Sequence, residues 1–135
     1  MTNLELARWY SGLLGTLLVV IGLAGFVDNP IIGRPSSEPV FHSGVALNVV
    51  HVASGAVALF IAFGLLGTGL IRGLIGFGLA YALLLVLTVA SPRLVGLLDE
   101  PVNLACNVLH AGVAVVSIAV GWLARGGERR ELGAG

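Results

Sequence analysis

The positions of the charged residues constrain this chain more than any other feature of its sequence. The charges are seven arginines and seven acids, and they leave four long uncharged stretches. These stretches are residues 9–27, 39–71, 73–92 and 101–124. An α-helix needs about 20 apolar residues to cross the hydrocarbon core of a bilayer. Each stretch is long enough for one such helix, and none is long enough for two helices with a turn between them.

The composition excludes the common classes of soluble protein. Apolar residues make up 57% of the chain and charged residues 10%, whereas roughly a quarter of the residues in an ordinary soluble domain are charged. A soluble domain of this size must cover a large surface with polar groups. A nucleic-acid partner would require clustered basic residues, and the net charge here is zero. The single cysteine excludes an intrachain disulfide and a multi-cysteine metal site.

The uncharged stretches therefore predict an all-α, polytopic membrane protein with a four-helix bundle. We place the transmembrane helices at residues 8–27, 44–66, 72–90 and 102–124. Helices are expected because a backbone inside lipid must satisfy its own hydrogen bonds. A transmembrane β-barrel would show alternating segments of about ten residues, which this sequence lacks. We predict one transmembrane domain over residues 1–135, with a flexible cytoplasmic tail at 125–135.

The arginines predict the orientation of the bundle. Five of them lie at the end that holds the two termini: Arg8, Arg72, Arg125, Arg129 and Arg130. The loops at the opposite end carry Arg34 and Arg93. Because Arg and Lys are enriched in cytoplasmic loops, we expect a multi-pass protein of the cell membrane with both termini in the cytoplasm.

A short motif recurs in the two halves of the chain. The pattern Asn-x-x-His occurs at residues 48–51 in the second predicted helix and at 107–110 in the fourth, and small residues follow both histidines. An arginine with a glycine four residues later opens the first and third helices, at Arg8 and Arg72. This pattern predicts two parallel repeats of a helical hairpin, related by a pseudo-twofold axis along the membrane normal. The predicted repeats span residues 8–66 and 72–124.

Each motif places polar side chains on one face of a helix. An asparagine and a histidine three residues apart share a face, and polar groups are costly against lipid. We therefore expect both polar patches to face the bundle interior and to meet in the outer half of the membrane. In the fourth helix the patch extends to Asn103. The candidate site consists of Asn48, His51, Asn103, Asn107 and His110.

Four interpretations of the two histidines stay open. We favour an interhelical clamp, in which imidazoles and carboxamides form hydrogen bonds across the axis. Alternatively, His51 and His110 bind a cofactor as the axial ligands of haem b. A zinc or copper site is a third interpretation, although two imidazoles and two carboxamides are a poor ligand set, so we predict no metal. The fourth is a path for protons or a small molecule.

Other residues have simpler expected roles. We expect Cys106 to behave as a small apolar residue and Tyr81 to form a local hydrogen bond within the third helix. Small residues let transmembrane helices approach closely, and the chain has 20 glycines. The predicted glycine seams are Gly12, Gly15, Gly22 and Gly25 in the first helix and Gly69, Gly73 and Gly76 in the third.

No signature of a known catalytic class occurs in the sequence. It contains no P-loop, dinucleotide fingerprint, zinc-protease motif or nucleophile elbow, and no predicted span holds a carboxylate for acid–base catalysis. We predict a protein without enzymatic activity, a structural or accessory membrane module. Its expected partners are the lipid bilayer and a second copy of the chain or a larger membrane complex, not nucleic acid.

The two motifs, the four spans and the small residues after each histidine resemble the domain-of-unknown-function 4383 family. Its members are small four-helix integral membrane proteins, and the likeness covers residues 8–124. The resemblance implies a polytopic membrane protein and brings no activity with it. The proline-rich first loop departs from the family by its length. The chain is also loosely similar to DoxX-like four-helix proteins, whose association with quinone or thiol redox chemistry implies a redox role for the two histidines.

Overall fold

The computed structural model of this chain describes residues 1–34 and 38–133. Four helices dominate this part: α1 (Asn3–Ala24), α2 (Val45–Gly64), α3 (Gly67–Ala90) and α4 (Leu104–Gly133). Each helix is long and apolar enough to cross a membrane. The prediction of an all-α, four-helix membrane protein is confirmed.

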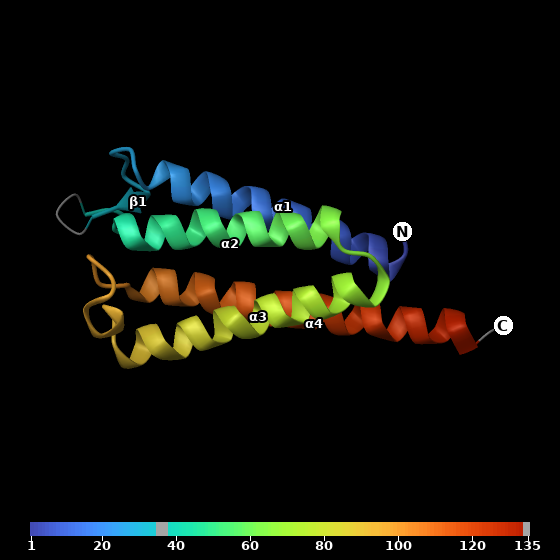
Figure 1. The fold of residues 1–135 in the computed structure, drawn as a ribbon. Coiled ribbons are helices and arrows are strands. Elements are labelled where there is room, and N and C mark those ends of the chain that lie inside the picture. The colour runs from blue at the N-terminus through green and yellow to red at the C-terminus, as the bar shows by residue number, and fades with distance from the viewer. Residues whose placement is uncertain (35–37, 134–135) are drawn as a thin grey trace.

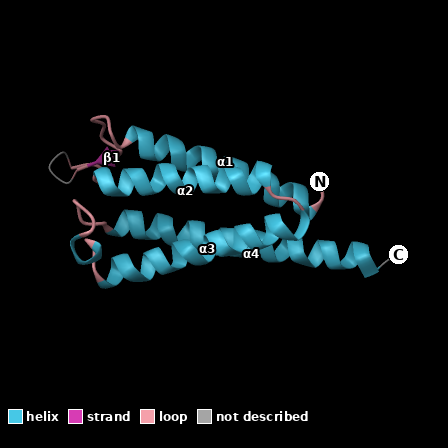
Figure 2. Cartoon of the chain, viewed as in Figure 1, coloured by secondary structure: helices cyan, strands magenta, loops and turns pink. Residues whose placement is uncertain are grey.

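The helices form two hairpins that lie side by side (Figure 1). α1 packs along α2, α3 packs along α4, and α1 also contacts α4 and α3. Both termini and the short connection between α2 and α3 lie at one end of the bundle, the terminal end (Figure 1). The α1–α2 and α3–α4 connections lie at the other, the loop end, where Figure 2 draws most of the non-helical chain. The prediction that the hairpins are repeats of one unit stays a prediction.

α1, α3 and α4 are all longer than predicted, and α3 begins at Gly67 rather than at residue 72. α1 begins at Asn3 rather than at residue 8, because Thr2 and Glu5 form a capping box. The Glu5 N–H donates to Thr2 Oγ1 over 3.1 Å, and the Thr2 N–H donates to Glu5 Oε2 over 2.7 Å. α4 continues to Gly133, so the predicted flexible tail is helical over 125–133, where arginine and glutamate favour the helix. Residues 134–135 lie outside the described part of the chain.

Glycines allow the closest helix contacts within each hairpin. A β-carbon at Gly15 would lie 2.8 Å from the backbone oxygen of Gly55, and Gly22 meets the backbone of α2 in the same way. The predicted seam of α1 is thus correct at Gly15 and Gly22. In α3 the close contact with a helix backbone is at Gly78, whose β-carbon would lie 2.9 Å from a backbone oxygen of α4, whereas the predicted Gly73 meets the side chains of Ile61 and Leu65. The predicted seam is wrong at Gly76, which has no atom within 4 Å of that position, because it faces away from the other helices.

The loop end also holds two very short strands. β1 (Ile32–Gly33) pairs in parallel with β2 (Phe41–His42), within the connection from α1 to α2. The connection from α3 to α4 contains a short 3-10 helix, η2 (Leu94–Gly96). The two strands precede α2 and the 3-10 helix precedes α4, and α2 and α4 are the helices that carry the candidate site.

Two apolar clusters fill the bundle at different depths. The smaller one, at the loop end, contains Leu47, Leu98, Val102 and Cys106. The larger one draws on all four helices and includes Leu18, Ile61, Leu74, Phe77 and Val113. On the outside of the helices, large apolar side chains such as Leu13, Phe63, Val86 and Trp122 are exposed, as expected of a surface that faces lipid.

Candidate functional site

The two histidines of the repeated motif meet in the interior of the bundle. His51 is the seventh residue of α2 and His110 is the seventh residue of α4, counted from Val45 and Leu104. Their ring centroids are 5.9 Å apart and the ring planes make an angle of 54°. The side chains are 3% and 0% exposed. The structure therefore brings together two residues that are 59 positions apart in the sequence and belong to different hairpins.

The position of the pair follows from the helical period. Leu47 precedes His51 by one turn, and Cys106 precedes His110 by one turn; both belong to the apolar cluster at the loop end. The larger apolar cluster begins on the side of the pair that faces the terminal end, with Val113 one turn after His110. The imidazoles thus form a polar layer between two apolar clusters inside the bundle.

The hydrogen-bonded clamp predicted from the sequence is not formed. All four ring nitrogens of His51 and His110 are buried, and no described residue bonds to any of them. The carboxamides do not reach the rings because nearer partners hold them. The side chain of Asn48 accepts a 2.5 Å hydrogen bond from Ser43 Oγ, and that of Asn107 accepts one of 2.7 Å from Thr88 Oγ1.

Asn103 lies apart from the histidines and has a structural role. Its Oδ1 accepts a hydrogen bond of 3.0 Å from the Cys106 N–H, which caps the start of α4. Its Nδ2 donates to the backbone oxygen of Val40 in the other hairpin over 2.9 Å. Of the five predicted site residues, the structure therefore brings together the two histidines and places the three asparagines towards the loop end.

Tyr81 of α3 joins the pair, which the sequence analysis did not anticipate. Its ring packs edge-on against His110, with centroids 5.7 Å apart. Its hydroxyl lies 2.8 Å from Ser54 Oγ of α2, and that oxygen also donates to the backbone oxygen of His51 over 3.1 Å. The predicted hydrogen bond within α3 is thus wrong, because Tyr81 turns into the bundle. A tyrosine in the middle of an apolar span needs a polar partner, and that need was the available signal.

The pair offers nitrogen ligands without acidic neighbours. Among the described residues, no group of three or more His, Cys, Asp or Glu side chains could hold a metal ion. The thiol of Cys106 is buried and donates to the backbone oxygen of His42 over 3.2 Å. The buried polar side chains of the described chain include no carboxylate. The site can therefore bind through two neutral imidazoles, and the predicted role of the pair as cofactor ligands stays a prediction.

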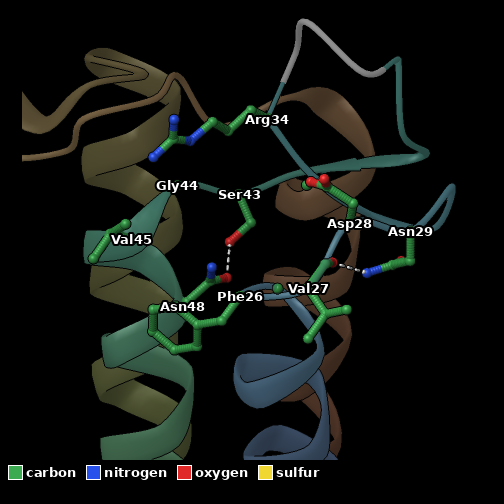
Figure 3. Close-up of a pocket in the computed structure, with 11 residues that line it drawn as sticks. Phe26, Val27, Asp28, Asn29, Arg34, Ser43, Gly44, Val45 and Asn48 are labelled. Carbon is green, nitrogen blue, oxygen red and sulfur yellow. Dashed lines mark hydrogen bonds between the residues drawn. The ribbon is translucent and has the colours of Figure 1, made fainter.

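A polar pocket opens at the loop end, between the end of α1 and the start of α2. Its volume is about 450 Å³, and its lining includes Asp28, Arg34, Ser43 and Asn48. Figure 3 shows the hydrogen bond from Ser43 to Asn48 inside the pocket, with Asp28 and Arg34 towards its outer edge. Asn48 lies one helical turn before His51 on α2. The pocket therefore approaches the histidine pair from the loop end.

The start of α2 beside this pocket is capped from the other hairpin. The N–H groups of Val45 and Ala46 donate to the carboxylate of Asp99 over 2.8 and 3.0 Å. Gly44 allows this close approach, because a β-carbon there would lie 2.5 Å from the carboxylate and would displace it. Burial works against ionisation of Asp99, but these hydrogen bonds and the charge of Arg34 outweigh it and lower the pKa of Asp99. A carboxylate at a helix N-terminus also meets the positive end of the helix dipole.

One protein family matches nearly the whole chain. The profile of the Domain of unknown function (DUF4383) matches residues 8–123, a range that contains both histidines and the greater part of every helix. No curated protein and no solved structure matches the chain, and the similarity to DoxX-like proteins stays a prediction. The sequence resemblance to the first family is confirmed: this chain belongs to the family of the Domain of unknown function (DUF4383).

Proposed function

We propose that this protein is a structural or accessory module of the cell membrane, without enzymatic activity of its own. One observation carries the proposal: the buried hydroxyl groups of the helices are used to join helices. Ser11 Oγ of α1 donates to the backbone oxygen of Ala58 in α2 over 2.8 Å. Ser117 of α4 pairs with the Tyr10 hydroxyl of α1 over 2.9 Å. Thr88 of α3 pairs with Asn107 of α4.

The electrostatics of the bundle support a role without acid–base catalysis. Three charged groups, those of Glu5, Arg8 and Asp99, form hydrogen bonds at the ends of helices. Arg8, for example, donates from its guanidinium to the backbone oxygens of Ala62 and Leu65 at the end of α2. A general acid or base must reach the proton that it transfers, and the buried polar side chains of the described residues include no carboxylate.

The partners in this proposal are lipid and other membrane proteins, including a second copy of the chain. Each helix keeps large apolar side chains exposed, and transmembrane helices associate through close packing of such surfaces. In this proposal the protein, with a mass of 13.8 kDa per chain, uses the exposed apolar faces of its helices to contact the other members of a membrane complex. We propose that its termini lie in the cytoplasm, on the basis of the arginine distribution.

The assembly is tested by native electrophoresis and cross-linking of the protein extracted from its own membranes in a mild detergent. The proposal expects a homo-oligomer or a larger complex that persists when His51 and His110 are both changed to alanine. The protein reconstituted in liposomes should show no ion or solute flux that depends on these histidines. A strictly monomeric protein, or flux abolished by His51→Ala and kept by His42→Ala, would overturn the proposal.

A further inference from the structure

The two imidazoles are the strongest sign of a ligand in this bundle. Both nitrogens of His51 and both nitrogens of His110 are buried without a hydrogen bond to any described residue. Buried polar atoms almost always have a partner, so an exception requires an explanation, such as an ion. A neutral imidazole has one nitrogen with a free lone pair. The two rings therefore offer one lone pair each, from different helices, within reach of one small ion.

The separation of the rings fits one metal ion between them. The bond from an imidazole nitrogen to a metal such as zinc is about 2.0 Å long, so two such bonds in a line span about 4 Å. A nitrogen that turns towards the partner ring lies nearer to that ring than its own centroid does. With one nitrogen of each ring turned inwards, the centroid separation of 5.9 Å is of the size that such a bridge requires.

Two ligands without charge favour a metal ion that has a low charge and accepts two-coordinate binding. Structural zinc sites use four ligands, whereas the described residues contain no cluster of three candidate ligands. A divalent ion bound by two neutral ligands would keep its full charge in apolar surroundings, which is costly. Cu(I) carries half that charge, its filled d shell accepts two ligands in a line, and imidazole suits copper.

We propose that His51 and His110 together bind a single Cu(I) ion between α2 and α4. Each imidazole binds through its unprotonated nitrogen and keeps the proton on the other nitrogen, so no proton is released and no electron is transferred. This site goes beyond the proposed function, which requires no metal. It reverses our expectation from the sequence, which assumed that carboxamides satisfy the imidazoles.

In this proposal the ion enters from the polar pocket at the loop end. The pocket contains the carboxylate of Asp28 and the guanidinium of Arg34, and its lining reaches Asn48, one helical turn from His51. Figure 3 shows the carboxylate, hydroxyl and carboxamide oxygens of Asp28, Ser43 and Asn48 that an ion would meet there.

A haem fits the same residues less well. Its macrocycle would have to lie between the two rings, and Tyr81 already packs against His110 with centroids 5.7 Å apart. The hydroxyl of Tyr81 is in turn held by Ser54 of α2. A bare ion needs none of this packing to change.

The test is a titration of the purified full-length protein in detergent with Cu(I), kept reduced by ascorbate, against a chromogenic Cu(I) chelator. We expect one Cu(I) per chain. X-ray absorption should show two nitrogen neighbours and the pre-edge feature of linear Cu(I). His51→Ala and His110→Ala should each weaken binding by at least about a hundredfold, since loss of a ligand exceeds the effect of losing an outer-shell partner.

His42→Ala is the matched control, because His42 lies in β2 outside the pair, and it should bind as the wild type does. Cys106→Ser should also keep full binding, since the thiol is bonded elsewhere. Circular dichroism checks that each variant is folded. Failure of the folded wild type to compete with the chelator would overturn the proposal, as would equal binding of Zn(II) or binding that depends on Cys106. None of these outcomes bears on assembly, so the proposed function would stand or fall separately.

Discussion

Gly15 of α1 and Gly55 of α2 lie where two helix backbones touch. A β-carbon at Gly15 would lie 2.8 Å from the backbone oxygen of Gly55, and a β-carbon at Gly55 would lie 2.7 Å from that of Gly15. Backbone atoms cannot rotate away as a flexible side chain can. Gly15→Ala should therefore push α1 from α2 and destabilise the protein by about 1–3 kcal/mol, measured by denaturant unfolding in detergent.

Gly76→Ala is the control for this prediction. No atom lies within 4 Å of a β-carbon there, and alanine favours a helix over glycine by about 1 kcal/mol. This variant should be as stable as the wild type or more so. Equal stability of the Gly15→Ala and Gly76→Ala variants would contradict the close contact of the two backbones.

The hydroxyl groups of Tyr81 and Ser54 form the polar link nearest to the histidine pair. They lie 2.8 Å apart on α3 and α2. A hydrogen bond of this kind contributes about 0.6 kcal/mol in a membrane protein. The double-mutant cycle of Tyr81→Phe and Ser54→Ala should give a coupling energy of that size, obtained from unfolding free energies. The same cycle with Tyr81→Phe and Ser117→Ala is the control and should give no coupling, because Ser117 bonds to Tyr10 instead.

At the residue scale, the sequence was enough to predict that the histidines meet, but not which partners the neighbouring asparagines bind. Equal depth in two similar hairpins was enough to predict that His51 and His110 meet. The partner of Asn107 is Thr88, and the partner of Asn48 is Ser43. The first depends on how α3 is rotated against α4, and the second on how the loop folds back over α2. The spacing of residues along one helix reveals neither the rotation of α3 against α4 nor the path of the loop.

The α2 helix is held at both ends by charges from other elements. Asp99, between η2 and α4, accepts hydrogen bonds at its N-terminus, and Arg8 of α1 donates to its last carbonyl groups. Both charges have the sign that opposes the helix dipole. Asp99→Asn loses the negative charge and one of the two acceptor oxygens, so it should destabilise the protein by roughly 0.3–1 kcal/mol at neutral pH, the usual size of the interaction between a charge and a helix dipole.

This effect should depend on pH in a defined direction. The pKa of Asp99 in the folded protein is lowered below its ordinary value of 3.8. A group with a depressed pKa contributes its stability fully above the unfolded pKa and loses it as the pH falls through the folded value. The difference in melting temperature between wild type and Asp99→Asn should be constant near neutral pH and shrink below about pH 4. Glu100→Gln, at the next position, should not reproduce this profile.

At the element scale, hydropathy located all four helices, and their ends required other information. A charged residue was read as a boundary, yet Arg8 lies inside α1 because its guanidinium reaches the end of α2. The capping box of Thr2 and Glu5 is a local pattern and could have been recognised. The cap of α2 could not, because Asp99 is 54 residues from Val45 and only the packed bundle brings them together.

At the scale of the whole molecule, both termini lie at one end of the bundle (Figure 1), and four membrane crossings require this. The sequence adds a preference for which side that end faces. Five arginines belong to the terminal end and two to the loop end, and the cytoplasmic side of membrane proteins is the richer in Arg and Lys. The guanidinium of Arg8 donates to backbone oxygens at the end of α2. Arg72 and Arg125 are exposed at the terminal end and contribute to its excess of positive charge.

Reporter fusions test this orientation directly. A green fluorescent protein fused after Gly135 should fluoresce, and alkaline phosphatase fused there should be inactive, because the former folds in the cytoplasm and the latter needs an oxidising compartment. Phosphatase inserted after Gly33, at the loop end, should be active and serves as the opposite control. Since topology depends on the difference in arginines between the two ends, the double variant Arg72→Ala, Arg125→Ala should produce a mixed population. An active phosphatase at the C-terminus of the wild type would mean that the loop end, with the pocket above the histidine pair, faces the cytoplasm.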